Sequence, residues 1–276
     1  MTYWDVEERG GIAVAKHNNP PMNYLVAGGT AELAKLIEGW RRPEVRVVVI
    51  TGAPKGKYIT HYSVEELVQS GDDPERLRQS AHGLIFGYHA LLRSLAYLDK
   101  PVIAAMTGDT MGAGLELSLN CDIRIAERGD FRLGFPEVAL GILTGTGSQL
   151  LARMIGLGRA LDFLLRSRVV TPEGALELGI VNELADDARA RAMEVAEGLA
   201  KLSTVSVVAA KRSIVRGANL PIEEGLRIEG EEWLKTIVTP EAMRLMRDYV
   251  ATPFDKRREW LRAHSVPPVA KNATGA

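Results

Sequence analysis

Along the first two-thirds of the chain, short runs rich in β-branched residues alternate with stretches in which apolar residues recur at helical spacing. Residues 12–15 and 46–51 predict strands, and the second contains the run VVVI, which is typical of a strand buried on both faces. Between them lies a predicted helix that we expect Thr30 to cap. Its apolar positions are Leu33, Leu36, Ile37 and Trp40. This order of elements predicts a βαβ-like unit.

The middle of the chain predicts a long helix followed by further strands. Asp73 and Pro74 open this helix, which we expect to end at Lys100. One stripe of the helix carries Leu77, Ala81, Leu84, Tyr88, Leu91 and Leu95. Beyond it we expect strands at 102–106, 123–126 and 131–133, with a glycine-rich turn and a helix from Gly112. The predicted fold class is α/β.

The last third of the chain predicts helices only. Thr171 and Pro172 form a cap and first-turn pair. The later helices are expected at 205–216, 222–237, 240–251 and 254–263, and residues 265–276 are expected to form a flexible tail. We therefore divide the chain into a core at 1–200, a helical region at 201–264 and a tail at 265–276. The aromatic residues Trp233, Tyr249 and Trp260 indicate that the helical region packs against the core or another subunit.

Composition excludes several classes of protein. The 276 residues carry 34 basic and 35 acidic side chains, so the clustered positive charge of a nucleic-acid-binding protein is missing. No apolar run approaches the roughly 20 residues of a membrane span. The first ten residues are acidic where a signal peptide would be basic and then apolar, and the single cysteine excludes an internal disulfide. These features predict a cytoplasmic protein that binds neither nucleic acid nor membrane, and no sequence pattern supports a metal site.

The segment 100–122 (KPVIAAMTGDTMGAGLELSLNCD) carries the strongest candidate chemistry. A predicted strand runs through a glycine-rich turn at Gly112, Ala113 and Gly114 into a helix with Glu116 near its start. Free N–H groups and the helix dipole at such a turn would stabilise a developing oxyanion. A tight strand-to-helix connection without a ligand is the alternative interpretation.

Two further segments add candidate groups. Ser63 and Glu66 form a capping box, so the N–H of Tyr62 is a possible second oxyanion donor, although a simple capped helix explains the pattern as well. Glu137 follows Glu116 by 21 residues with a predicted strand pair between them, so the chain can bring the two carboxylates face to face. In a close, partly buried pair, the pKa of one carboxyl group would be raised so that it can act as a general acid, and the other group would remain ionised as a base. Two surface glutamates are the alternative.

Several ordered motifs together resemble the crotonase (enoyl-CoA hydratase/isomerase) superfamily, over roughly residues 10 to 260. They are the segment 100–122, the loop 135–137 (FPE), the run 168–183 (RVVTPEGALELGIVNE), the run 19–23 (NPPMN), the strand 47–52 (VVVITG) and the run 209–212 (AAKR). The resemblance implies a core of repeated ββα turns in a spiral, topped by a C-terminal helical oligomerisation region, and a homotrimer or hexamer. It also implies an acyl-CoA substrate, with CoA as part of the substrate and no prosthetic group.

The resemblance implies a role for each matching position. The donors of the oxyanion hole would be the N–H groups of Tyr62 and Ala113, and the catalytic carboxylates would be Glu116 and Glu137. The vicinity of the water and substrate would comprise Gly145, Gly112 and His61. Water held between the two glutamates would add to a 2-enoyl thioester, making the protein an enoyl-CoA hydratase-like lyase. Isomerases of the superfamily generally replace the position of Glu116, so its retention favours hydration.

The sequence departs from the family pattern at several positions. Thr60, His61, Tyr62 and Ser63 stand where Ala-Gly-Ala-Asp is usual, Ala113 replaces a glycine, and Thr144 replaces a proline. The side chains of His61 and Tyr62 are larger than those usual in the family. They would block the acyl pocket, change its shape or supply a proton donor, and we favour a change of shape. The alternatives are therefore another enolate reaction, such as double-bond isomerisation or hydrolysis of a C–C or thioester bond, or a catalytically silent scaffold.

A few residues outside these motifs have simpler interpretations. Cys121 matches a core position of the family and is expected to be an inert buried thiol. The residues His82 and His89 on the long helix are interpreted as packing or surface residues. In the last third, Lys211, Arg212 and Lys256 are candidates for contacts with the CoA phosphates, with a solvated face as the more common explanation.

Overall fold

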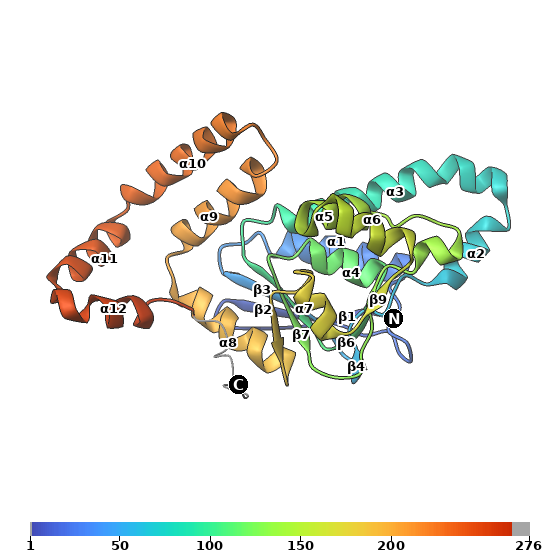
Figure 1. Ribbon diagram of the computed structural model, residues 1–276, viewed down its shortest axis with the longest axis horizontal. Coiled ribbons are helices and arrows are strands. Elements are labelled where there is room, and N and C mark those ends of the chain that lie inside the picture. Colours follow the sequence, from blue (N-terminus) through green and yellow to red (C-terminus); the bar gives the residue numbers. More distant parts are fainter. Residues whose placement is uncertain (1, 267–276) are drawn as a thin grey trace.

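Two β-sheets lie at the centre of the protein, for which a computed structural model describes residues 2–266 (Figure 1). The larger sheet has the strand order β1 (Trp4–Arg9), β2 (Ile12–His17), β3 (Val47–Gly52), β5 (Val102–Met106), β7 (Ile123–Glu127) and β10 (Glu183–Ala185). Only β1 and β2 pair antiparallel; the other neighbours are parallel. Every residue of β3 and β5 is buried, which explains their continuous apolar runs.

One face of the larger sheet is covered by α8 (Ala188–Lys201). The small side chains of Ala188, Ala192 and Ala196 pack against strand residues such as Val47 and Ile103. Because alternate strand residues point to opposite faces, the neighbouring positions Val48 and Ala104 face the other side of the sheet. This alternation builds two separate hydrophobic layers.

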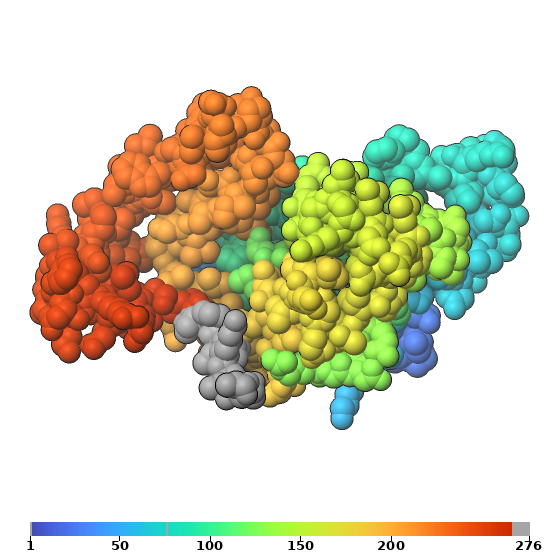
Figure 2. Space-filling view, in the orientation of Figure 1, coloured from blue at the N-terminus to red at the C-terminus, as the bar shows by residue number. Residues whose placement is uncertain are grey.

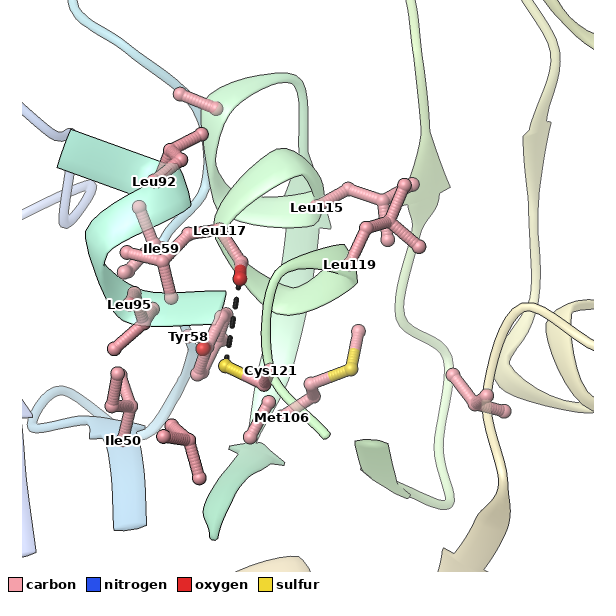
Figure 3. Packing of buried hydrophobic residues seen from close by; sticks show 14 of the residues in the cluster. Ile50, Tyr58, Ile59, Leu92, Leu95, Met106, Leu115, Leu117, Leu119 and Cys121 are labelled. Carbon is pink, nitrogen blue, oxygen red and sulfur yellow. Dashed lines mark hydrogen bonds between the residues drawn. The ribbon is translucent and has the colours of Figure 1, made fainter. Parts of the chain in front are cut away.

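The opposite face carries the main core, formed with α1 (Ala27–Gly39), α3 (Pro74–Ala96) and α4 (Ala113–Leu119). Figure 3 shows Leu92 and Leu95 of α3 beside Leu117 of α4, with Ile50 of the sheet below them. The Cys121 thiol lies in the same cluster, where its Sγ donates to the carbonyl of Leu117 at 3.4 Å. All seven residues of α4 are buried, so its position is fixed by the surrounding core.

A second, smaller sheet positions the loops around α4. Its order is β4 (Gly56–Lys57), β6 (Gly108–Met111), β8 (Leu133–Gly134) and β9 (Val169–Val170). Gly56 pairs with Gly108, and Thr110 pairs with Leu133. The chain continues from β4 to Tyr62, from β6 into α4, and from β8 to Glu137. Three neighbouring strands thus deliver the three candidate segments to one end of the sheet.

The remaining helices surround this centre or project from it. They are α2 (Val64–Gly71), η1 (Glu137–Leu140), α5 (Gly147–Ile155), α6 (Leu157–Leu165), α7 (Pro172–Glu177), α9 (Thr204–Gly217), α10 (Ile222–Ile237), α11 (Pro240–Ala251), η2 (Phe254–Lys256) and α12 (Arg257–Ala263). Figures 1 and 2 show α10 to α12 as an arm extending away from the sheets. Within residues 2–266, no helix has the length and hydropathy to span a membrane.

Most predicted elements are present, but several expectations were wrong. The last third does not contain helices only, because β10 adds a parallel strand to β7. Thr30 does not cap α1; the N-cap is Val26, and the Thr30 hydroxyl donates to the Ala27 carbonyl inside the helix. The long helix ends at Ala96, before Lys100.

The Thr171 cap was predicted correctly, whereas several short strands were missed. Thr171 caps α7 as expected, since its side chain accepts from the Gly174 N–H at 3.3 Å. The strands β1, β4, β6 and β9 were not predicted; β4 and β6 are short and contain glycine, and β9 has two residues, so these three carry little alternation. Of the predicted tail, Val266 packs with the α8 layer, and residues 267–276 lie outside the described part of the chain.

Candidate active site

Glu116 lies buried in α4 and is held at the beginning of a second helix. Its Oε1 accepts hydrogen bonds from the N–H groups of Thr146, at 2.6 Å, and Gly147, at 3.1 Å, where α5 begins. These N–H groups belong to the unpaired first turn of a helix, where the helix dipole favours a negative charge. Two main-chain donors therefore fix the position of Glu116 Oε1 at the beginning of α5.

Glu137 lies at the start of η1 and has a different environment. Its Oε2 is buried without a hydrogen-bond partner among the described residues. Burial, together with the nearby charge of Glu116, raises the pKa of Glu137 to about 7, although the Glu137 main-chain N–H lowers it in part. A large fraction of the Glu137 carboxyl groups is therefore protonated at neutral pH.

Two residues that line the same cavity as the carboxylates have main-chain N–H groups without an acceptor among the described residues. Tyr62 and Ala113 both line the cavity, and neither N–H donates a hydrogen bond within residues 2–266. The Met111 N–H donates to the Thr60 carbonyl at 2.8 Å, which holds the two segments side by side. A pair of free N–H groups at adjacent turns is the arrangement that stabilises a carbonyl oxygen as it gains negative charge.

Two glycines make this approach possible. A Cβ on Gly114 would lie 1.8 Å from the Ile59 carbonyl oxygen, so only glycine lets α4 lie directly against the loop that carries Tyr62. Gly112 has a φ of +49°, and its Cβ would lie 2.6 Å from Glu137 Oε1. The glycines of the turn therefore provide both a left-handed backbone conformation and room for a carboxylate.

The cavity between these groups has a volume of about 720 Å³ and an apolar wall. Helix α1 contributes Ala27, Ala31 and Ala34, which lie on one face at helical spacing. Further apolar side chains of the wall come from α2, α3, η1 and the loop after η1: Val64, Leu67, Leu84, Ile85, Leu91, Leu140, Ile142 and Leu143. Among the described residues, neither lysine nor arginine lines the cavity, which suits an uncharged acyl group.

The side chains of the unusual 60–63 loop are held at the wall of the cavity. The Tyr62 hydroxyl donates to Glu66 Oε2 at 2.8 Å, and the His61 ring stacks on Tyr24 with 4.2 Å between centroids. Both His61 and Tyr62 contribute to the lining. The Tyr62 hydroxyl is thus engaged with Glu66, and the cavity remains open beside it. The side chains of this loop shape the pocket.

Helix α3 contributes two residues whose position the sequence did not reveal. A hydrogen bond of 2.7 Å joins His89 Nε2 to the Gly145 carbonyl, so His89 anchors the loop before α5. Tyr88 lines the cavity, with its ring against Gly145. Helical spacing predicted Tyr88 as a packing residue in the apolar stripe of α3. Its hydroxyl group, among aliphatic neighbours in that stripe, was the one feature of the sequence that could have indicated a place at the cavity.

The remaining candidates lie away from the cavity. Burial raises the pKa of Cys121 to about 12, which fits the expected inert thiol. Lys211 pairs with Asp122 at 2.8 Å, and Arg212 pairs with Asp99 at 2.6 Å, so both cations are engaged in joining α9 to the core. Lys256 lies near Glu259 at 3.7 Å. Within residues 2–266, no cluster of three or more metal-ligating side chains is present.

Comparison with known proteins identifies the family. A family model described as "Enoyl-CoA hydratase/isomerase" matches residues 7–252. The chain therefore belongs to the enoyl-CoA hydratase/isomerase family, within the crotonase superfamily, as the sequence motifs predicted.

Individual relatives are similar over most of their length. The chain is 30% identical to a short-chain-enoyl-CoA hydratase of Clostridium acetobutylicum, covering 92% of this chain and 95% of the relative. It is 31% identical to an (E)-benzylidenesuccinyl-CoA hydratase of Thauera aromatica, covering 80% and 85%. The crystal structure of an enoyl-CoA hydratase from Bacillus anthracis superimposes with a TM-score of 0.81 at 26% identity, covering 96% and 98%. The predicted α/β crotonase fold is confirmed.

Proposed function

We propose that the protein catalyses the reversible addition of water to the double bond of a 2-enoyl-CoA thioester, with Glu116 and Glu137 as the catalytic pair. The observation that carries this proposal is the meeting of two dissimilar carboxylates and two free N–H groups at one apolar cavity. Family membership and the named activities of the relatives support the same reaction.

The geometry supports a specific division of roles. Glu116, whose negative charge is stabilised by two N–H donors, accepts a proton from the water as its oxygen adds to the β-carbon. Glu137, with its pKa raised to about 7, supplies a proton to the α-carbon. The N–H groups of Tyr62 and Ala113 stabilise the enolate oxygen between these two events. Gly145 and Gly112 leave room for the water and the thioester, and His61 forms part of the wall.

The binding site favours an uncharged acyl group, because a charged one would be buried in an apolar cavity without a partner. CoA enters as part of the substrate, and no step of the proposed reaction needs a prosthetic group. We further propose that the protein is a cytoplasmic homotrimer or hexamer, with residues 1–200 as the catalytic core and 201–264 as the helical oligomerisation region. The exposed apolar side chains of the C-terminal helices support this assembly.

The proposal is tested by incubating the protein with a panel of 2-enoyl-CoA and 3-enoyl-CoA thioesters and measuring product mass. Hydration adds one water to a 2-enoyl substrate, isomerisation leaves the mass unchanged, and hydrolysis of the thioester releases free CoA. Failure to convert any thioester would favour a silent scaffold and contradict the proposal.

The roles of the two carboxylates are tested by Glu116→Gln and Glu137→Gln. Each change is expected to reduce kcat by roughly 100- to 10,000-fold, the usual contribution of a general acid or base, while CoA binding persists. Glu177→Gln, at an exposed position of α7, is the matched control and should retain full activity. Full activity in either active-site variant would refute its assigned role.

A further inference from the structure

The Tyr88 hydroxyl is a buried polar group whose only polar neighbour of note in the described protein is the Glu116 carboxylate, without a hydrogen bond of normal geometry between them. Tyr88 extends from α3 into the cavity wall, and its Oη has no hydrogen-bond partner of normal geometry within residues 2–266. Glu137 Oε2, in the wall of the same cavity, is also buried and unpartnered. Buried hydroxyls are normally paired, since an unpaired one loses its hydration without compensation. A phenylalanine would fill this position without that cost.

The position of Tyr88 connects it to the reacting end of the cavity. A Cβ placed on Gly145 would lie 3.0 Å from Tyr88 Cε1 and 3.2 Å from Glu116 Oε2, so the Tyr88 ring and the free oxygen of Glu116 meet at the same backbone position. The hydrogen bond from the neighbouring His89 to the Gly145 carbonyl fixes α3 against this loop. The location of the Tyr88 ring is therefore determined by its helix and not by a flexible segment.

The surroundings of Tyr88 keep its hydroxyl proton in place. Burial, the charge of Glu116 and the interaction of the hydroxyl with the Glu116 carboxylate, and the charge of Glu137 raise the pKa of Tyr88 well above its ordinary value. The hydroxyl consequently remains neutral at physiological pH, with one proton to donate and lone pairs to accept. Tyr88 lines the same cavity as the two carboxylates, so a ligand atom that enters between them comes close to this residue.

We propose that Tyr88 is a third catalytic residue, whose hydroxyl hydrogen bonds to the oxygen at the β-carbon of the acyl group. This oxygen is the attacking water in one direction and the 3-hydroxyl of the product in the other. The inference rests on the proposed hydratase function and deepens it, because it assigns the group that recognises a 3-hydroxyacyl thioester.

The reaction balances without a proton from Tyr88. The C–O bond forms between water and the β-carbon, one water proton passes to Glu116, and the Glu137 proton passes to the α-carbon. Tyr88 retains its proton and stabilises the oxygen through the transition state. Because both directions share this transition state, loss of the hydroxyl slows hydration and dehydration alike.

The test compares Tyr88→Phe with Tyr97→Phe, which removes an exposed hydroxyl directly after the end of the same helix, where its partner is Arg93. Binding of a 3-hydroxyacyl-CoA and of the saturated acyl-CoA of equal chain length is measured by titration calorimetry for each protein. The wild type and Tyr97→Phe should prefer the 3-hydroxyacyl thioester by about tenfold, and Tyr88→Phe should lose this preference while binding the saturated thioester unchanged. An undiminished preference in Tyr88→Phe would overturn the proposal.

Activity and thermal unfolding complete the test. In Tyr88→Phe, kcat for hydration should fall about tenfold or more, and the melting temperature should stay equal or rise because a buried hydroxyl without a hydrogen bond of normal geometry has been removed. A lower melting temperature would mean that the hydroxyl has a structural partner, and would also overturn the proposal. If the wild type hydrates no enoyl thioester but still discriminates the 3-hydroxyl through Tyr88, the proposed hydratase function fails and the recognition role stands.

Discussion

Two residues of one type acquire different chemistry in this protein because their surroundings differ. Glu116 has main-chain N–H donors at the beginning of α5, whereas Oε2 of Glu137 is buried without a hydrogen-bond partner among residues 2–266. Donors stabilise an ionised carboxylate, and burial without donors stabilises the neutral acid. This difference supports the proposal that Glu116 acts as the base and Glu137 as the acid.

The first prediction concerns the dependence of the reaction rate on pH. Glu137 must be protonated to act as the acid for hydration, and its pKa is raised to about 7. We expect kcat/KM for hydration to be high below about pH 7 and to fall tenfold per pH unit well above it. Initial rates across pH 5 to 9 with one enoyl thioester provide the measurement. A hydration rate that stays constant up to pH 9 would exclude Glu137 as the acid.

A second prediction links the same residue to stability. The raised pKa means that the folded protein holds a proton that the unfolded chain releases above about pH 4.5, so the free energy of unfolding decreases as pH rises from about 4.5 to about 7. Glu137→Gln removes this ionisation. At pH 8 the variant should be more stable than the wild type by on the order of 2–3 kcal/mol, with the difference vanishing below about pH 4.5.

This stability difference is measured by urea unfolding of both proteins at pH 8 and at the lowest pH at which they stay folded. Glu177→Gln, exposed on α7, should show no comparable difference between the two conditions. Equal stability of wild type and Glu137→Gln at pH 8 would show that Glu137 ionises at little cost, contrary to its buried environment.

At the level of elements, the candidate site depends on how closely α4 approaches the 60–63 loop. The main chain of Gly114 touches the Ile59 carbonyl so closely that a side chain cannot fit between them. Gly114 is also buried within α4, whose other side is fixed by Leu115 and Leu117 in the core. The helix can therefore retreat only by opening the packed layer shown in Figure 3.

We expect Gly114→Ala to destabilise the protein by about 1–3 kcal/mol and to lower the hydration rate, since the N–H of Ala113 would move away from that of Tyr62. Gly158→Ala is the matched control: Gly158 lies in α6, and no atom lies within 4 Å of the position that an added methyl group would take, so alanine should be neutral or stabilising by up to about 1 kcal/mol. Thermal unfolding and steady-state rates distinguish the two variants. Unchanged behaviour of Gly114→Ala would contradict the close contact.

Several elements could be predicted from the sequence because their signals are local. The buried run of β3, the Pro74 start of α3 and the Thr171 cap of α7 each depend on neighbours within a few residues. The strand β10 and the two-residue strand β4 carry no comparable signal, because each is stabilised by a partner strand distant in the sequence. These two strands form because they pair with β7 and β6, which the local sequence does not reveal.

On the scale of the whole molecule, the C-terminal helices are incompletely covered. Figure 1 shows α10, α11 and α12 extending beyond the sheets, while α9 is tied to the core by the ion pairs of Lys211 and Arg212. The arm exposes large apolar side chains, with exposed fractions of 57% for Trp233, 58% for Leu234 and 74% for Val238. Apolar surface of this extent is typical of protein–protein contacts.

The last prediction concerns assembly. We expect light scattering to give a mass three or six times that of the 30.1 kDa chain. Replacing Leu234 and Val238 with glutamate should shift the protein towards monomer, because unpaired charges would be buried in the interface. Glu229→Gln, an exposed polar change on the same helix, should leave the mass unchanged. A monomeric wild type would contradict the assignment of the arm as an oligomerisation region.

The sequence by itself determined the α/β pattern, the glycine turn before α4, the family and the pair of candidate glutamates. Only the tertiary structure decided that α5 supplies donors to Glu116, that burial raises the pKa of Glu137, and that α3 brings Tyr88 and His89 to the cavity. The physical reason is that periodicity and turn chemistry act between residues a few positions apart. The charge, protonation and hydrogen bonding of a side chain depend on packing between segments that the chain brings together from far apart.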